Sequence, residues 1–176
     1  MTYADDVPKP PAICRPIAAE SVPWKEWGEG ERFLSRYRHL TTAAAGLGYH
    51  VGVEIDELPP GKQSAPAHYH MLEEEHIFVL EGGCTLRLGD ERHELRAGDY
   101  VCFPAGQALG HCLINEGHAI CRLLVIGERS PNEVCVYTDS NKVLVRNLGE
   151  IYDKRAVRKY WDGETMSSSL GPNDRP

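Results

Sequence analysis

The sequence predicts an all-β domain made of many short antiparallel strands. Turn signals recur about every 8 to 12 residues in the middle of the chain, a spacing typical of sandwiches and barrels. They lie at Pro59-Pro60-Gly61, Gly82-Gly83, Gly89-Asp90, Gly98-Asp99, Pro104-Ala105-Gly106 and Asn115-Glu116-Gly117. Between turns, apolar residues alternate at Val51, Val53 and Ile55 and again at Leu86 and Leu88, as on half-buried strands. A sandwich, a jelly roll or a closed barrel is therefore expected, because these architectures limit exposed strand edges.

The remaining elements are assigned by the same reasoning. Residues 118–127 form a longer apolar run, which is typical of a strand buried on both faces. Helix is scarce: residues 150–161 are the best candidate and residues 26–37 a weaker one. We expect an N-terminal arm over residues 1–31, rich in Pro and Ala near its start, and one barrel domain over residues 32–161. Residues 162–176 lack apolar anchors and are predicted to be disordered.

Composition narrows the class of protein. The 176 residues carry 19 Lys and Arg against 26 Asp and Glu, a net charge of −7, which repels polyanions and makes nucleic acid an unexpected partner. No apolar run approaches the roughly 18 residues of a membrane span, so no membrane partner is expected. The N-terminus carries acids and prolines where a secretory signal would place a basic and then an apolar stretch. We therefore expect a cytoplasmic protein.

Six cysteines are present, without a CxxC pair or a regular ladder. They are Cys14, Cys84, Cys102, Cys112, Cys121 and Cys135. We expect them to be reduced and mostly to serve as small core residues.

Chemistry is concentrated around two histidines separated by one residue. On a strand, His68 and His70 point to the same face, while the residue between them points away. A carboxylate from the next strand would complete a three-point clamp suited to iron, manganese, nickel, zinc or copper. Glu73, Glu74 and Glu75 all offer such a group.

A second stretch adds a third imidazole. It runs from Gly98 through Pro104 and Gly106 to His111, at the head of a predicted strand that leads to Asn115. The two stretches resemble the two conserved motifs of the cupin superfamily, G(X)5HXH(X)3,4E(X)6G and G(X)5PXG(X)2H(X)3N. The resemblance covers about residues 46–127. This chain has one extra residue before His68 and two extra before His111, both in turns, where insertions are tolerated.

The resemblance implies a fold and a ligand set. The fold is a double-stranded β-helix, the jelly-roll barrel of cupins, with N- and C-terminal extensions. The metal ligands by resemblance are His68, His70, Glu75 and His111, with Glu75 preferred to Glu74 because six residues then separate it from the glycine that closes the motif. One divalent transition metal ion is implied: zinc, iron, manganese, nickel or copper.

The reaction is less specified than the fold. Small cupins often described as sugar-phosphate isomerases make that class the leading expectation, with a small-molecule substrate. An isomerase of this kind needs an inward basic group for the phosphate, for which Lys62, Arg87 and Arg122 are candidates, although strand parity places Arg87 outside. The alternatives are a metal-dependent dioxygenase or related oxidoreductase, and a non-catalytic module that binds a small ligand. The resemblance also implies a homodimer.

Overall fold

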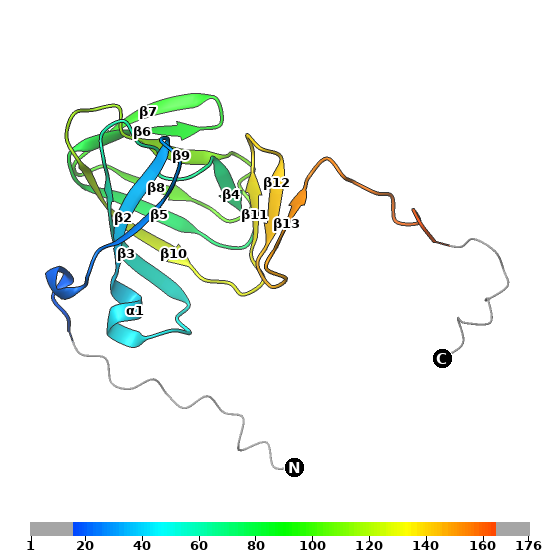
Figure 1. The fold of residues 1–176 in the computed structure, drawn as a ribbon, viewed down its shortest axis with the longest axis horizontal. Helices are drawn as coiled ribbons and strands as arrows, with labels where there is room; N and C mark the ends of the chain where they lie inside the picture. Colours follow the sequence, from blue (N-terminus) through cyan, green and yellow to red (C-terminus); the bar gives the residue numbers. More distant parts are fainter. Residues whose placement is uncertain (1–15, 165–176) are drawn as a thin grey trace, which may run out of the picture.

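The structure, a computed structural model, describes residues 16–164, and its regular secondary structure is almost entirely β-strands packed in two layers (Figure 1). The first sheet contains, in spatial order, β1 (Lys25–Glu29), β2 (Phe33–His39), β3 (Val51–Leu58), β10 (Cys121–Glu128), β5 (Glu75–Glu81) and β8 (Tyr100–Phe103). The second contains β13 (Glu150–Asp153), β12 (Lys142–Val145), β11 (Val134–Tyr137), β4 (His68–His70), β9 (His111–Ile114), β6 (Gly83–Leu88) and β7 (Glu91–Arg96). The predicted all-β jelly-roll architecture is confirmed.

The strands alternate between the two sheets as the chain proceeds. From β3 onward the chain crosses to β4, returns to β5, crosses to β6 and β7, returns to β8, and crosses again to β9 before β10. Each pairing between two of the strands β1 to β13 is antiparallel. This winding brings β4, β5 and β9 to one region of the interior.

The hydrophobic core lies between the sheets. It is formed by residues from β3, β5, β8 and β10 on one side and from β6 and β9 on the other. Its buried members are Leu58, Ile77, Val79, Cys84, Leu86, Phe103, Leu113, Cys121 and Leu123. Of the cysteines within residues 16–164, Cys84, Cys112, Cys121 and Cys135 are buried and Cys102 is half-buried, and all five are free. The expectation that the cysteines are mostly buried core residues therefore holds for the described part of the chain, outside which Cys14 lies.

One predicted turn shows why glycine is needed where the chain crosses between sheets. Gly82 joins β5 to β6 with φ +75°, a left-handed conformation that other residues adopt at a cost. A Cβ built at this position would also lie 2.6 Å from the carbonyl oxygen of Ile120. Any side chain here would therefore strain the turn and push apart the neighbouring strand.

Both predicted helices are wrong. Residues 26–37 form parts of β1 and β2, which pair as a hairpin, and residues 150–161 begin with β13, which pairs with β12, and continue without helix. The backbone groups of these segments bond to a neighbouring strand, which outweighs a weak local helical preference. Within residues 16–164 the helices are a 3-10 turn at Ala19–Ser21 and one short α-helix, α1, at Leu40–Ala45.

The expected terminal extensions fall largely outside the described residues. Residues 1–15 of the expected arm and residues 165–176 of the expected disordered tail are not described. The rest of the arm includes β1, which adds an edge strand to the first sheet. None of the helices in residues 16–164 has the length and apolar character that crossing a membrane would require.

Candidate metal centre and adjoining cavity

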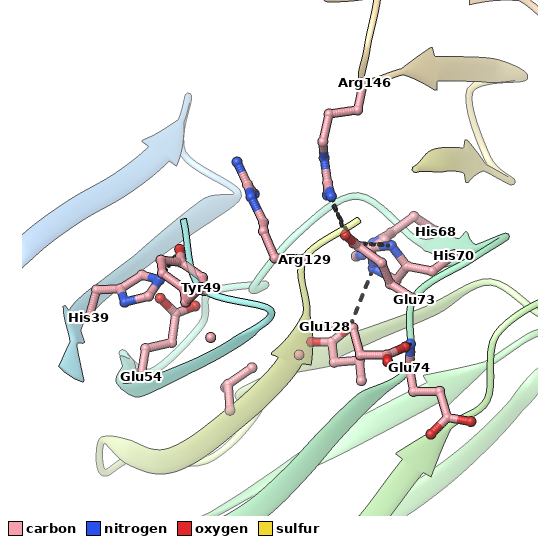
Figure 2. Close-up of a pocket in the computed structure, with 14 residues that line it drawn as sticks. His39, Tyr49, Glu54, His68, His70, Glu73, Glu74, Glu128, Arg129 and Arg146 are labelled. Carbon is pink, nitrogen blue, oxygen red and sulfur yellow. Dashed lines mark hydrogen bonds and ion pairs between the residues drawn. The ribbon is translucent and has the colours of Figure 1, made fainter. Parts of the chain in front are cut away.

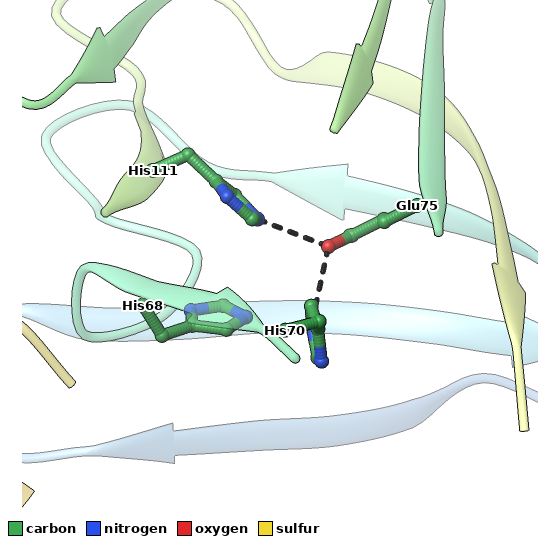
Figure 3. A group of neighbouring side chains, drawn as sticks. All are labelled: His68, His70, Glu75 and His111. Carbon is green, nitrogen blue, oxygen red and sulfur yellow. Dashed lines mark hydrogen bonds and ion pairs between the residues drawn. The ribbon is translucent and has the colours of Figure 1, made fainter. Parts of the chain in front are cut away.

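Four side chains from three strands converge inside the barrel (Figure 3). His68 and His70 lie on β4 and share a face, Glu75 begins β5, and His111 begins β9 directly opposite His68. One nitrogen or oxygen atom from each of the four lies within 4.8 Å of the corresponding atoms of the other three. The structure thus brings together all four residues that the sequence analysis singled out.

Glu75 forms the centre of this cluster. Its Oε2 lies 3.0 Å from Nε2 of His111 and 3.6 Å from Nε2 of His70. The fallback residue, Glu74, does not join the cluster. Its side chain is half exposed, and its Oε2 lies 3.8 Å from Nε2 of His76. Glu75 is the first residue of β5, whereas Glu74 precedes the strand and turns its side chain toward His76.

Contacts outside the cluster fix the orientation of two imidazoles. Nδ1 of His68 lies 2.8 Å from the carbonyl oxygen of Pro66, which can only accept, so Nδ1 carries the proton. Nδ1 of His70 lies 3.3 Å from Oε1 of Glu133, a fully buried carboxylate that imposes the same tautomer. In both rings the Nε2 lone pair is left for the centre of the cluster, the arrangement found where histidines bind metal ions.

Packing and buried charge support the same arrangement. The ring of His111 stacks on Phe103 with centroids 3.7 Å apart and planes 5° apart. Glu133 also accepts hydrogen bonds from the backbone N–H groups of Met71 and Leu72, at 2.9 and 3.0 Å. The loop after β4 is thereby tied to the start of β11, which keeps His70 in place.

Two of the four groups have the protonation states that a bound cation requires. Burial, with the neighbouring His111, lowers the pKa of His68 to about 4, so this ring is neutral at neutral pH. Burial alone would raise the pKa of Glu75, but hydrogen bonds from His111 and His70 outweigh it and hold that pKa below its usual range. Burial likewise lowers the pKa of His70, but the hydrogen bond to Glu75 and the nearby carboxylates leave it raised. Metal ligation requires neutral imidazoles and an ionised carboxylate. His68 and Glu75 are already in these states, whereas His70 must give up the proton that its carboxylate neighbours favour. The donor set fits a divalent transition metal.

A hollow extends from this cluster along the inner face of the first sheet. It consists of two adjoining cavities, of about 200 and 430 Å³, which share His39, Tyr49, Glu54, His68, Glu75, Val125 and Arg129 in their walls. Figure 2 shows the smaller one, with the His68 and His70 side opposite Glu54. Space of this size holds a small metabolite.

Acidic side chains in this hollow were missed by the sequence analysis. Glu54 and Asp56 alternate with Val53 and Ile55 on β3, a pattern that favours placing the acids in solvent. The structure places both in the wall of the larger cavity. Burial, with the charge of Glu75, raises the pKa of Glu54 to about 7, and burial with the charges of Glu54 and Glu75 raises the pKa of Asp56 to about 8.

The expected basic groups for a phosphate are elsewhere. Within residues 16–164, neither cavity is lined by Lys62, Arg87 or Arg122. Nζ of Lys62 donates to the carbonyl oxygen of Glu31, Arg87 pairs with Asp139, and Arg122 pairs with Glu57 and Glu81. The prediction that Arg87 points outward is correct. The prediction that Lys62 or Arg122 supplies the inward basic group is wrong, because each is bound to partners outside the hollow.

Two other arginines border the hollow. Arg146 lines the smaller cavity but forms a two-point ion pair with Glu73, one arm of which measures 2.9 Å. Arg129 lines both cavities, and in the described part of the chain no carboxylate is paired with its guanidinium. No motif marks Arg129 in the sequence, apart from its place just after the apolar run that forms β10.

Comparisons with known proteins agree with this geometry. The family model described as "Cupin domain" matches residues 55–127. A solved structure of a putative sugar phosphate isomerase from Acidithiobacillus ferrooxidans is 33% identical, with 72% of this chain and 80% of that chain covered and a TM-score of 0.67. A sugar phosphate isomerase from a cupin superfamily, from Silicibacter pomeroyi, is 27% identical, with 84% and 98% covered and a TM-score of 0.72.

A curated relative points to another reaction. Quercetin 2,3-dioxygenase of Bacillus subtilis (strain 168) is 42% identical over 80 residues, which make up 45% of this chain. The match spans only 24% of the length of that relative.

Proposed function

Because the chain belongs to the cupin superfamily, we propose that it binds one divalent transition metal and acts as a metal-dependent isomerase on a sugar phosphate or a similar small polar metabolite. The proposed ligands are His68, His70, Glu75 and His111. The single observation that carries the proposal is their convergence, with four candidate ligand atoms within 4.8 Å of one another beside a hollow of metabolite size. The metal is zinc, iron, manganese, nickel or copper, all of which accept such a donor set.

The residues of the chain prepare this centre in advance. Pro66 and Glu133 hold the protons on Nδ1 of His68 and His70, so that the Nε2 atoms remain free to bind. Glu75 keeps its negative charge and partly offsets the charge of a divalent ion. When bound, the metal would supply Lewis acidity, which polarises a carbonyl or hydroxyl oxygen of the substrate.

Support for the isomerase reaction comes from the similarity to the two solved sugar phosphate isomerase structures, one of them putative, and from the guanidinium of Arg129 at the hollow. The test is interconversion of aldose and ketose phosphates, followed by NMR with the protein loaded with each candidate metal in turn. We expect turnover with at least one sugar phosphate and none for the His70→Ala variant. Metal-loaded protein that converts no member of a panel of pentose and hexose phosphates would contradict the proposed reaction.

A dioxygenase is the second candidate, favoured by the 42% identity to quercetin 2,3-dioxygenase over 80 residues. In this case His68, His70, Glu75 and His111 would hold a redox-active metal such as iron. Oxygen consumption with quercetin, measured at an electrode under the same loading conditions, separates the two reactions. Binding of small molecules without any turnover would instead indicate a non-catalytic binding module.

We also propose that the protein is a homodimer that takes small molecules rather than nucleic acid as ligands. The net charge of −7 supports the second part, because it disfavours contact with polyanions. Size-exclusion chromatography with light scattering tests the first part, for which we expect about twice the 19.6 kDa chain mass. A monomer at micromolar concentration would contradict it.

A further inference from the structure

The register of the first sheet places two acidic residues deep inside the barrel. In an antiparallel sheet, residues directly opposite each other point to the same face. Glu54 on β3 lies opposite Val125 on β10, which lies opposite Ile77 on β5. Asp56 occupies the next inward row and lies opposite Leu123. Since Ile77 and Leu123 belong to the hydrophobic core, this face of the sheet is the interior one. Glu54 and Asp56 therefore line the part of the hollow that runs from Glu75 toward the core.

Neither carboxyl group is used by the fold. In residues 16–164, Glu54 and Asp56 take part in no ion pair with an arginine or lysine, and Oδ1 of Asp56 is buried without a hydrogen-bond partner. An acceptor buried without a donor costs free energy, and the cost is greater when the group is charged. On β2, Glu54 lies opposite His39 and Asp56 lies opposite Tyr37, but neither neighbour donates a hydrogen bond to these carboxyl groups. A structural reason for keeping the two acids on this face is therefore lacking, which points to a ligand that brings the donors.

The chemistry of the walls narrows the ligand. Neither Glu54 nor Asp56 belongs to a cluster with metal-binding distances among the described residues, so a second cation is not what their geometry favours. A flat apolar molecule would leave the carboxyl groups desolvated and unpaired, which is costly. Hydroxyl groups donate to carboxylate oxygens and accept from protonated ones, so a polyhydroxylated molecule satisfies both residues.

Arg129 supplies the opposite charge in the same hollow. Arg129 comes directly after β10, and both Arg129 and Glu54 line the two cavities. The nearby Arg146 is instead paired with Glu73 (Figure 2). A guanidinium binds phosphate and carboxylate groups in a two-point fashion. The hollow therefore has an acidic wall on β3 and a cationic group just beyond the end of β10. The proposed metal ligands, on β4, β5 and β9, also lie along it.

We propose that this hollow binds a polyhydroxylated anion of the sugar-phosphate type in one orientation, with hydroxyl groups on Glu54 and Asp56 and the anionic group on Arg129. The proposal rests on the proposed function, because the remaining contact of the substrate would be with the metal. It adds the residues that select the substrate and excludes the reverse orientation, in which the anion would face two acidic side chains.

The test is calorimetric titration of the full chain, loaded with the metal found on purification, with a panel of pentose and hexose phosphates and their unphosphorylated sugars. The variants are Glu54→Gln, Asp56→Asn and Arg129→Gln. Matched controls are Glu91→Gln and Arg96→Gln on β7, whose side chains are 76% and 80% exposed. Metal content and melting temperature are measured on every sample.

We expect Glu54→Gln and Asp56→Asn each to weaken binding of the best sugar phosphate at least tenfold with unchanged metal content. Arg129→Gln should weaken the phosphorylated sugar at least tenfold and its unphosphorylated counterpart less than twofold. Controls should bind like wild type. Metal-loaded variants at positions 54 and 56 that bind like wild type overturn this inference alone. A metal-loaded wild type that binds no panel member overturns the proposed isomerase reaction and this inference with it. A wild-type chain that takes up no metal overturns the proposed function and this inference with it.

Discussion

Glu133 offers a sharp test of how the proposed metal centre is held. It is not a proposed ligand, and it contacts the proposed ligand His70 through the Nδ1 atom of that ring. Its carboxylate is fully buried and accepts from Nδ1 of His70 and from the backbone N–H groups of Met71 and Leu72. The substitution Glu133→Gln keeps the shape and removes the charge. The amide has a single acceptor oxygen, so its NH2 group must face one of the donors that the carboxylate now receives.

The magnitude follows from these contacts. Loss of a carboxylate that orients a metal-binding histidine costs about 10–100-fold in metal affinity, or about 1.4–2.7 kcal/mol. At least one of the two backbone hydrogen bonds to the charged group is also lost, at about 1.5–3 kcal/mol before the relief of burying a charge is counted. We expect the variant to be folded at 25 °C, to melt at lower temperature and to bind metal at least tenfold more weakly.

The assay is competition for the metal against a chromophoric chelator at pH 7.5, with folding verified by circular dichroism in the same buffer. Glu116→Gln is the matched control, because that carboxylate also accepts side-chain hydrogen bonds, from Thr85 and Arg92, but is 56% exposed and distant in the fold on the β9–β10 connection. A folded Glu133→Gln variant whose metal affinity stays within twofold of wild type would refute the reasoning about His70.

Three further perturbations test other parts of the account. In metal-free protein, the raised pKa of Asp56 means that the folded state holds a proton that the unfolded state releases near pH 4. The stability contribution of this group is therefore lost as pH rises from about 4 to 8. At pH 8 in chelator, Asp56→Asn should raise the melting temperature by about 2–4 °C, which corresponds to about 1 kcal/mol of stability. No rise at pH 8 would argue against the buried position of this carboxyl group. Gly127→Val should leave the fold and metal binding intact, because the nearest atom to a Cβ there is the Glu74 carbonyl oxygen at 3.9 Å. It should weaken binding of small ligands, because the added methyl groups enter the smaller cavity. Calorimetry that shows full ligand affinity would contradict this prediction. Leu123→Ala, at a core position 2% exposed, should cost about 2–5 kcal/mol in urea unfolding, and a loss under 1 kcal/mol would show that Leu123 is not packed as described.

The fold class and the pair of His68 and His70 could be predicted from the sequence because both depend on local signals, whereas Glu75 and His111 were assigned as ligands by the family resemblance. Turn residues such as Gly82 mark the ends of the strands. Side chains alternate along any strand, so His68 and His70 share one face whichever sheet their strand joins. The position of His111 opposite His68 depends on strand pairing, which the family resemblance supplied and spacing alone did not.

The rest depended on long-range contacts that no local pattern records. Acidic residues that alternate with Val53 and Ile55 resemble a solvent face, and only the pairing of β3 with β10 shows that Glu54 and Asp56 point inward. Residues 150–161 have a helical composition, but backbone bonding of β13 to β12 determines their start. Glu133 is distant in sequence from His70, so its contact with that ring follows from the pairing of β11 with β4.

The central claim is that three imidazoles and one carboxylate hold a single metal ion, and elemental analysis by mass spectrometry tests it most directly. The protein should be purified without a nickel column, beside His70→Ala and the surface variant His93→Ala on β7 as control. We expect about one equivalent of a transition metal per chain in wild type and in His93→Ala, and less than a tenth of that in His70→Ala. Equal metal content in wild type and His70→Ala, or none in wild type after exposure to each candidate metal, would contradict the account.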